Sequence, residues 1–236
     1  MARPAPGRAN PLIAGPIPMQ SQSAPGTAPV LCLRGISKSF PGVRALNGVQ
    51  LDLYPGQVTA LIGENGAGKS TIVKILTGIY QPDEGTIAVD GKETQFPTAQ
   101  AAGAAGVTAI HQETVLFDEM TVAENIFIGH APRGRFGLID TRRMEAEAQR
   151  LLSSIGAELD PKVRLRDLGI ASKHLVAIAR ALSIDARVVI MDEPTAALSH
   201  KEINELYDLV DKLRLQGKAI LFIWHKFDEI FRIADR

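Results

Sequence analysis

The sequence predicts an α/β fold in which a largely parallel sheet is covered by helices on both faces. Three observations indicate this class. Aliphatic runs alternate with helical patterns from Val30 onward. Several of these runs have no polar break, which is typical of parallel strands buried on both faces. A glycine-rich stretch then separates one such run from a helix. In folds of this kind ligands bind at the carboxyl ends of the strands.

The individual elements follow from local patterns. Pro82, Gly85 and Gly91 punctuate a hairpin-like piece around residues 86–91. Gly156 and Gly217 are placed to end two helices, and Ser199 with Glu202 forms a capping box at the start of the second. Strands are expected at residues 30–40 (running into a loop), 58–63, 106–112, 186–193 and 218–225. Helices are expected at residues 70–80, 144–156 and 199–217.

Composition limits the classes of function. The 236 residues suit one domain with a sub-domain, and 26 basic residues balance 26 acidic ones, so nothing suggests nucleic acid as a partner. The one cysteine excludes an intramolecular disulfide, and no apolar run is long enough for a transmembrane helix. Residues 1–29 hold half of the 14 prolines and no acidic residue, which predicts a disordered tail. Between residues 115 and 182 helical patterns replace strands, which predicts a helical insert.

The glycine-rich stretch has the spacing of a phosphate-binding loop. It reads G-x-x-x-x-G-K-S between a strand and a helix, which predicts a P-loop NTPase fold. Glycines let backbone N–H groups converge on phosphate oxygens, and the following helix presents its positive end. Lys69 would add a charge toward the phosphates, and the Ser70 hydroxyl would ligate Mg²⁺. The nucleotide-binding residues expected here are Gly63, Glu64, Asn65, Gly66, Ala67, Gly68, Lys69, Ser70 and Thr71.

Polar residues end three other predicted strands. Asp192 and Glu193 close a buried strand, where the aspartate would hold Mg²⁺ and the glutamate would polarise an attacking water. Gln112 could sense the metal or the water, and His225 could reach a phosphate oxygen. The carboxyl ends of parallel strands meet at one edge of a sheet. The sequence therefore predicts that these residues converge on a bound nucleotide, with Ser70, Gln112 and Asp192 around the metal.

The ordered set resembles the nucleotide-binding domain of ATP-binding cassette (ABC) transporters over residues 30–236. KSFPGVRAL, GENGAGKSTIVKILTGIYQPDEG, HQE and DEPTAALS are similar to the first cassette of monosaccharide importers of the ribose, galactose and rhamnose group. The resemblance implies that Phe40 stacks on adenine, Gln112 lies in the Q-loop, Glu193 is the catalytic base and His225 the switch histidine.

The same resemblance implies the protein's partners. ATP and Mg²⁺ would be the cofactors, and the insert at 115–182 would meet membrane-spanning permease subunits. A second cassette, in the same or another chain, would complete the site, and a periplasmic sugar-binding protein would act indirectly. The protein would lie peripherally on the cytoplasmic face of the inner membrane. In tandem importers a second cassette follows the point where this sequence stops, which implies a C-terminally truncated chain.

Three positions depart from the family pattern. The signature LSGGQ is replaced by Leu168-Gly169-Ile170-Ala171-Ser172, which lacks the serine hydroxyl, although Ser172 could cap the following helix. Ser199 replaces the D-loop aspartate. Trp224 stands where a small residue usually precedes the histidine, and its ring is expected to pack on the face away from the phosphate loop. The altered signature sequence predicts slow ATP hydrolysis by the chain alone.

Three other functions stay open from sequence. The chain could be a regulatory or remnant cassette that binds ATP and hydrolyses little of it, which the altered signature favours. A soluble cassette ATPase acting on nucleic acid or ribosomes would need a basic surface, against which the balanced charge argues. A small-molecule kinase would need an acceptor pocket that no motif suggests.

Overall fold

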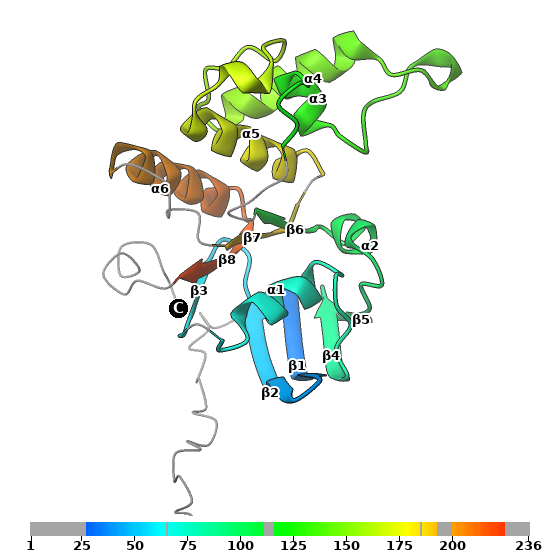
Figure 1. Cartoon of the computed structure of the whole chain (residues 1–236), viewed down its shortest axis with the longest axis vertical. Coiled ribbons are helices and arrows are strands. Elements are labelled where there is room, and N and C mark those ends of the chain that lie inside the picture. Colours follow the sequence, from blue (N-terminus) through cyan, green and yellow to red (C-terminus); the bar gives the residue numbers. More distant parts are fainter. Residues whose placement is uncertain (1–26, 65, 111–115, 185, 193–199, 225–236) are drawn as a thin grey trace, which may run out of the picture.

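The computed structural model describes residues 27–64, 66–110, 116–184, 186–192 and 200–224 of the chain. An antiparallel sheet forms one end of the molecule and a parallel sheet lies in the middle (Figure 1). Three helices form the other end, namely α3 at Val122–Ile126, α4 at Thr141–Ser154 and α5 at Ile170–Leu182. This arrangement confirms the predicted α/β class with an antiparallel β element. The expectations for most of the tail and for Asn65, Gln112, Glu193, His225 and the Ser199–Glu202 box lie outside the described residues and side chains.

The parallel sheet contains the strands that precede the predicted site. Its order is β3-β8-β7-β6, with β3 at Val58–Ile62, β6 at Val107–Ile110, β7 at Val188–Asp192 and β8 at Ala219–Trp224. All of β8 and the first four residues of β7 are buried. Burial on both faces explains why these strands lack polar alternation and why they could be recognised as apolar runs.

Alternate residues of the central strands face two separate cores. Val188 and Ile190 of β7 pack with the antiparallel sheet and with helix α1, Lys69–Leu76. Val189 and Met191 face the opposite core, to which α5 and α6 contribute. The parallel sheet is therefore held between two apolar layers, and the side chains of β7 and β8 point to opposite faces in turn.

The antiparallel sheet is larger than the sequence suggested. Its order is β2-β1-β4-β5, with β1 at Leu31–Phe40, β2 at Val43–Leu53, β4 at Glu84–Val89 and β5 at Lys92–Thr94. The hairpin expected around residues 86–91 is confirmed, since Val89 pairs with Lys92 across a turn at Asp90 and Gly91. Both turn residues have positive φ, as the tight turns of hairpins require.

Strand β2 was not predicted, and residues 30–40 do not run into a loop. β1 continues to Phe40 and pairs along its length with β2. Asn47 and Gly48 lie inside β2 at a register shift in its pairing with β1. Gly48 has φ +62°, and its N–H donates to the Ser37 hydroxyl at 3.0 Å. A bulge of this kind keeps the strand continuous.

The helices flank the parallel sheet and form the insert. Gly156, with φ +77°, follows the end of α4 as predicted, and Asp140 caps its start by accepting from the Arg143 N–H. The short helix α2 was not predicted. The remaining helices are α2 at Ala99–Ala104, α3 at Val122–Ile126, α4 at Thr141–Ser154, α5 at Ile170–Leu182 and α6 at His200–Leu215, with 3₁₀ turns at Arg135–Gly137 and Leu165–Asp167. No helix within the described ranges is long and apolar enough to cross a membrane.

Asn125 holds the segment before α3 in place. Its side chain is fully buried and accepts from the Phe117 N–H at 2.8 Å. Its amide nitrogen lies within 3.0 Å of the Phe117 carbonyl and 2.9 Å of the Thr121 carbonyl. The same segment accepts backbone N–H groups of Leu165 and Arg166. The buried amide therefore fixes the segment before α3, and backbone hydrogen bonds join this segment to the 3₁₀ turn at Leu165–Asp167.

We expect the Asn125→Ala substitution to lower the free energy of unfolding by about 3 kcal/mol. The alanine leaves buried backbone groups without partners, each at a cost of about 1–3 kcal/mol. Urea unfolding followed by circular dichroism measures the change. Arg143→Gln is the matched control, because it breaks a 2.8 Å surface ion pair with Glu147 in the same group of helices and should leave the midpoint almost unchanged. Equal losses in both variants would contradict the role of Asn125.

Candidate functional site

Lys69 is the centre of the candidate site. It is the first residue of α1, only 6% of its surface is exposed, and its Nζ donates to the carbonyls of Gly63 at 2.5 Å and Glu64 at 2.9 Å. The first turn of α1 contains no acidic residue. A cation at the positive end of a helix is unfavourable by itself, and becomes favourable when an anion binds there.

Two glycines shape the loop around Lys69. Gly68 has φ +85°, and a Cβ there would lie 2.6 Å from the Ala45 carbonyl oxygen of β2, so only glycine fits. Gly66 has φ +84°, but a Cβ there would meet nothing within 4 Å. Gly68 thus allows the close approach of β2, whereas Gly66 faces open space. A loop with this opening beside a helix N-terminus can admit a phosphate group.

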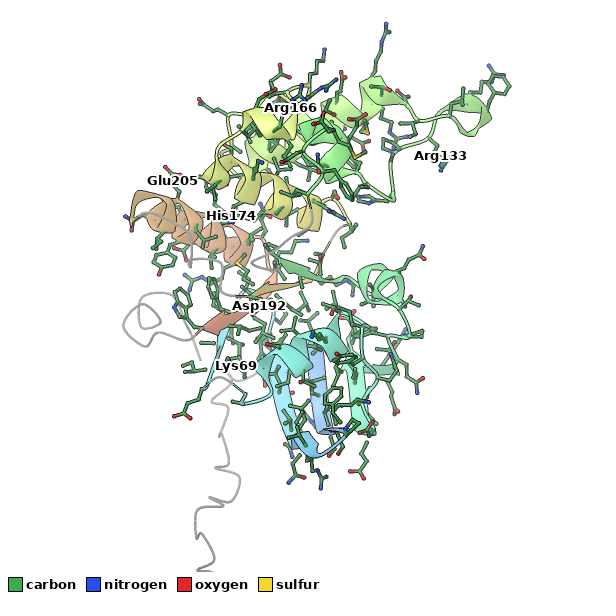
Figure 2. The ribbon with its side chains drawn as sticks, viewed as in Figure 1. Lys69, Arg133, Arg166, His174, Asp192 and Glu205 are labelled. Carbon is green, nitrogen blue, oxygen red and sulfur yellow. The ribbon has the colours of Figure 1, made fainter. Side chains whose placement is uncertain are left out.

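The carboxyl ends of the central strands line up beside this loop. Ile62, the residue before Gly63, pairs with Trp224, and Asp192 pairs with Ile223 on the same strand β8. The last residue of β6, Ile110, pairs with Met191. Figure 2 labels Lys69 and Asp192 close to this edge. The strands leading to residues 63, 112, 193 and 225 therefore end side by side at one edge of the sheet.

Trp224 packs as the sequence predicted. Its ring stacks on Phe222 with centroids 4.6 Å apart and lies 6.4 Å from the Tyr207 ring of α6. These residues belong to the core on the face of the sheet opposite α1. The bulky side chain therefore takes no space on the face that carries the phosphate loop.

Phe40 contacts a residue that sequence reasoning missed. Its half-buried ring, at the end of β1, lies 5.2 Å from the Tyr80 ring in an edge-to-face arrangement. Lys38 lies 5.9 Å from the centroid of Phe40, and Lys74 of α1 lies 5.3 Å from that of Tyr80. The only available signal for Tyr80 was its place as the last residue of the helix predicted at 70–80, whereas α1 ends at Leu76. Together the two rings make an aromatic surface next to the start of β2.

A groove lies between the parallel sheet and the helical insert. Its volume is about 910 Å³, and α2, β6, α5 and residues 128–130 line it. His130 hydrogen-bonds to the Ser183 hydroxyl through Nε2 at 2.7 Å, while Nδ1 lies 3.1 Å from the Ile128 carbonyl. Burial and, to a smaller extent, the charge of Arg180 lower the pKa of His130 below its usual value, although the hydrogen bond with the Ile128 carbonyl acts in the opposite direction.

Comparison with known proteins places this geometry in a family. Residues 46–196 match the family model described as ABC transporter. The chain belongs to the ABC transporter family. The ATP-binding cassette MJ1267 of an ABC transporter, in its ADP conformation, has a TM-score of 0.78 at 26% identity, covering 89% of this chain and 86% of that one. CbiO1 from Clostridium perfringens, part of the ABC transporter complex cbiONQ, has a TM-score of 0.75 at 25% identity, covering 88% and 83%.

Curated relatives within the ABC family are much closer in sequence. The chain is 76% identical over 208 residues to ribose import ATP-binding protein RbsA 1 of Rhizobium meliloti (strain 1021), a match that covers 88% of this chain and 41% of the relative. It is 73% identical over 212 residues to ribose import ATP-binding protein RbsA of Jannaschia sp. (strain CCS1), covering 90% and 41%. The resemblance to sugar-import cassettes is thereby confirmed, and the chain spans less than half the length of these relatives.

The ABC signature region begins helix α5, and here one expectation was wrong. Helix α5 begins at Ile170, and its N-cap is Gly169, which has no side chain to cap the helix. Ser172 therefore lies inside the first turn and cannot cap the helix. Lys173, the next residue, is held by Asp118 through an ion pair of 2.7 Å. The altered signature thus forms an ordinary helix start, anchored to the segment that Asn125 fixes.

Proposed function

We propose that this ABC cassette binds MgATP and hydrolyses it to energise import of a ribose-type monosaccharide. The observation that carries the proposal is Lys69, a nearly buried cation at a helix N-terminus, next to the aligned strand ends. The high identity to ribose import ATP-binding proteins supports the substrate class and an ATPase of the translocase type.

The donor set around the loop fits MgATP. Lys69 supplies positive charge, and the open space at Gly66 leaves room for a phosphate oxygen. Ser70 is exposed and Asp192 is partly exposed, and their oxygens are the ligand type that Mg²⁺ prefers. Bound Mg²⁺ would offset the charge of the phosphate oxygens. Gln112 completes the proposed metal ligands.

The reacting groups would come from the residues that follow the strands. Glu193 would orient and polarise the attacking water, and Gln112 and His225 would contact the terminal phosphate. The observed pairing of β6, β7 and β8 supports this assignment, because these residues follow strands that end side by side. Phe40, with Tyr80 behind it, would stack on the adenine ring. Catalysis would then consist of positioning and charge stabilisation.

The partners would meet two different faces. A second cassette, in the same or another chain, would bring its signature loop to this phosphate site. A cytoplasmic helix of the permease would enter the groove beside His130, whose size and position between sheet and insert suit a helix. A periplasmic sugar-binding protein would act through the permease. The cassette would extend over residues 30–236, with a tail at 1–29 and the insert at 115–182, and would lie at the cytoplasmic face of the inner membrane.

Nucleotide binding and permease-stimulated turnover test the proposal. We expect Mg²⁺-dependent binding of a fluorescent ATP analogue to the purified chain, and slow phosphate release that rises when membranes containing the ribose-type permease are added. Permease membranes without the chain provide the background. Binding without Mg²⁺ dependence, or turnover that the permease leaves unchanged, would contradict the proposal.

A second candidate function is a regulatory cassette that binds ATP and hydrolyses little of it. The observation that favours it is Gly169, which has no hydroxyl at the cap of α5. If the chain is such a regulatory cassette, two copies would pair an intact phosphate loop of one copy with the altered signature sequence of the other. The turnover of a Gly169→Ser variant distinguishes the two functions.

We expect Gly169→Ser to raise the turnover of the isolated chain about tenfold. A Cβ at Gly169 would meet nothing within 4 Å, and the backbone is extended at φ −69°, so serine fits without strain. The hydroxyl restores one hydrogen bond to a charged group, which contributes about 1.5–3 kcal/mol. Steady-state phosphate release at several protein concentrations measures the effect, with Gly169→Ala as the control that adds Cβ alone. Brisk concentration-dependent turnover that serine leaves unchanged would contradict the role of the signature.

A further inference from the structure

The segment between α3 and α4 is a hydrogen-bonded hairpin that extends away from the helical layer (Figure 1). The Gly134 N–H donates to the Leu138 carbonyl, and the Asp140 N–H donates to the Pro132 carbonyl, both at 2.9 Å. Arg133 pairs with Ile139 as an antiparallel bridge. The segment is therefore a defined structure, referred to below as the 131–140 hairpin.

Apolar side chains at the tip of the hairpin face solvent. Phe136 is 89% exposed, Leu138 is 72% exposed and Ile139 is 56% exposed. Phe136 also has φ +72°, a left-handed conformation that is rare for a bulky residue. Strained conformations of this kind cluster where binding requires them. Three exposed apolar residues on one ordered turn indicate a surface that a partner covers.

The charges of the hairpin identify the chemistry of that partner. Arg133 and Arg135 are both exposed, and the one acidic residue of the hairpin, Asp140, is at its base, where its carboxylate caps α4. Figure 2 labels Arg133 on the extended segment. Its guanidinium donates to the Gly137 carbonyl at 2.7 Å, while Arg135 lies 5.9 Å from the Phe136 ring. Arginine beside phenylalanine and leucine is the combination with which peripheral proteins enter the headgroup region of anionic bilayers.

The position of the hairpin agrees with this chemistry. Ile128, Gly129 and His130 line the groove, and the hairpin starts at the next residue. A cassette whose groove receives a permease would hold this tip on the membrane side. We infer that the 131–140 hairpin binds the surface of an anionic phospholipid bilayer, with Phe136 and Leu138 among the acyl chains and the two arginines at the headgroups.

Vesicle binding by the full chain tests the inference without ATP or permease, so its outcome is independent of the proposed transport function. We expect the chain to sediment with vesicles of phosphatidylglycerol and phosphatidylcholine, and much less with phosphatidylcholine alone. Phe136→Ser should weaken binding about tenfold, and Arg135→Gln about fivefold. The matched controls are Leu215→Ser, 84% exposed at the end of α6, and Arg150→Gln on the exposed side of α4, and both should bind as wild type.

Fluorescence provides a second measurement in the same sample. The chain has one tryptophan, Trp224, which is buried, so brominated anionic lipids should quench it little. We expect strong quenching in the F136W variant and weak quenching in an L215W variant. Equal binding to neutral and anionic vesicles, or unchanged binding by Phe136→Ser, would overturn the inference. The inference would also be overturned if the chain did not bind vesicles and hairpin variants lowered permease-stimulated turnover. That result would indicate a protein partner for the hairpin.

Discussion

Lys69→Met should remove nucleotide binding while leaving the apo protein as stable as the wild type. Lys69 is 6% exposed and lies at the positive end of α1, where desolvation and the helix dipole both oppose its charge. Its two hydrogen bonds to the Gly63 and Glu64 carbonyls compensate part of this cost. An isosteric apolar side chain therefore costs little without nucleotide, but it deletes the charge that a triphosphate needs.

Thermal unfolding with and without MgATP separates these two effects. At a nucleotide concentration 100 times the dissociation constant the wild type should gain about 2.7 kcal/mol, and Lys69→Met should gain almost nothing. Turnover should fall at least about 100-fold, the usual loss when one donor to the transition state is removed. A variant that keeps the MgATP-induced shift in melting temperature would show that Lys69 holds the loop together and does not bind phosphate.

Lys74→Met is the matched control on the same helix. Lys74 lies in the last turn of α1, where its charge suits the helix dipole, and it contacts the Tyr80 ring. Its loss should lower the melting temperature slightly and leave the MgATP-induced shift intact. Opposite behaviour of two lysines five residues apart on one helix would be hard to explain by a general change in stability.

Local patterns predicted the parts of the fold whose cause is local. The parallel strands β7 and β8 are almost entirely buried, and this burial is visible as continuous apolar sequence, whereas β3 is buried only at its start. The phosphate loop was predictable for the same reason. Its glycines, lysine and helix start lie within nine residues, 63–71, and their spacing is set by backbone geometry.

Features that depend on distant contacts were missed. β2 was not predicted, and its bulge at Gly48 depends on a hydrogen bond to the hydroxyl of Ser37 on the neighbouring strand. Ser172 looked like a cap, but the structure begins α5 two residues earlier. The groove beside His130 combines residues from 99 to 184, so no local pattern contains it. In each case tertiary packing decided between local structures that the sequence alone allows.

Glu193→Gln should leave MgATP binding intact and reduce turnover at least about 100-fold. The amide keeps the size of the side chain but cannot accept a proton, and general-base catalysis typically contributes about 10²–10⁴-fold. Because Asp192 ends β7 and pairs with Ile223, the residue after it follows a fixed strand end next to the phosphate loop. In this variant phosphate release should therefore fall, while the MgATP-induced shift in melting temperature should stay as large as in the wild type.

The neighbouring Asp192→Asn should behave differently if the two acids have separate roles. A metal ligand acts on the bound state, so its loss should weaken binding and shift the Mg²⁺ concentration needed for half-saturation. Glu193→Gln should leave that concentration unchanged, since a group that acts in the transition state does not alter ground-state affinity. Glu205→Gln, an exposed acid on α6, should change neither quantity. Hydrolysis near the wild-type rate in Glu193→Gln would show that another group orients the water, whereas a shared defect in both variants would mean that the pair acts only through the metal.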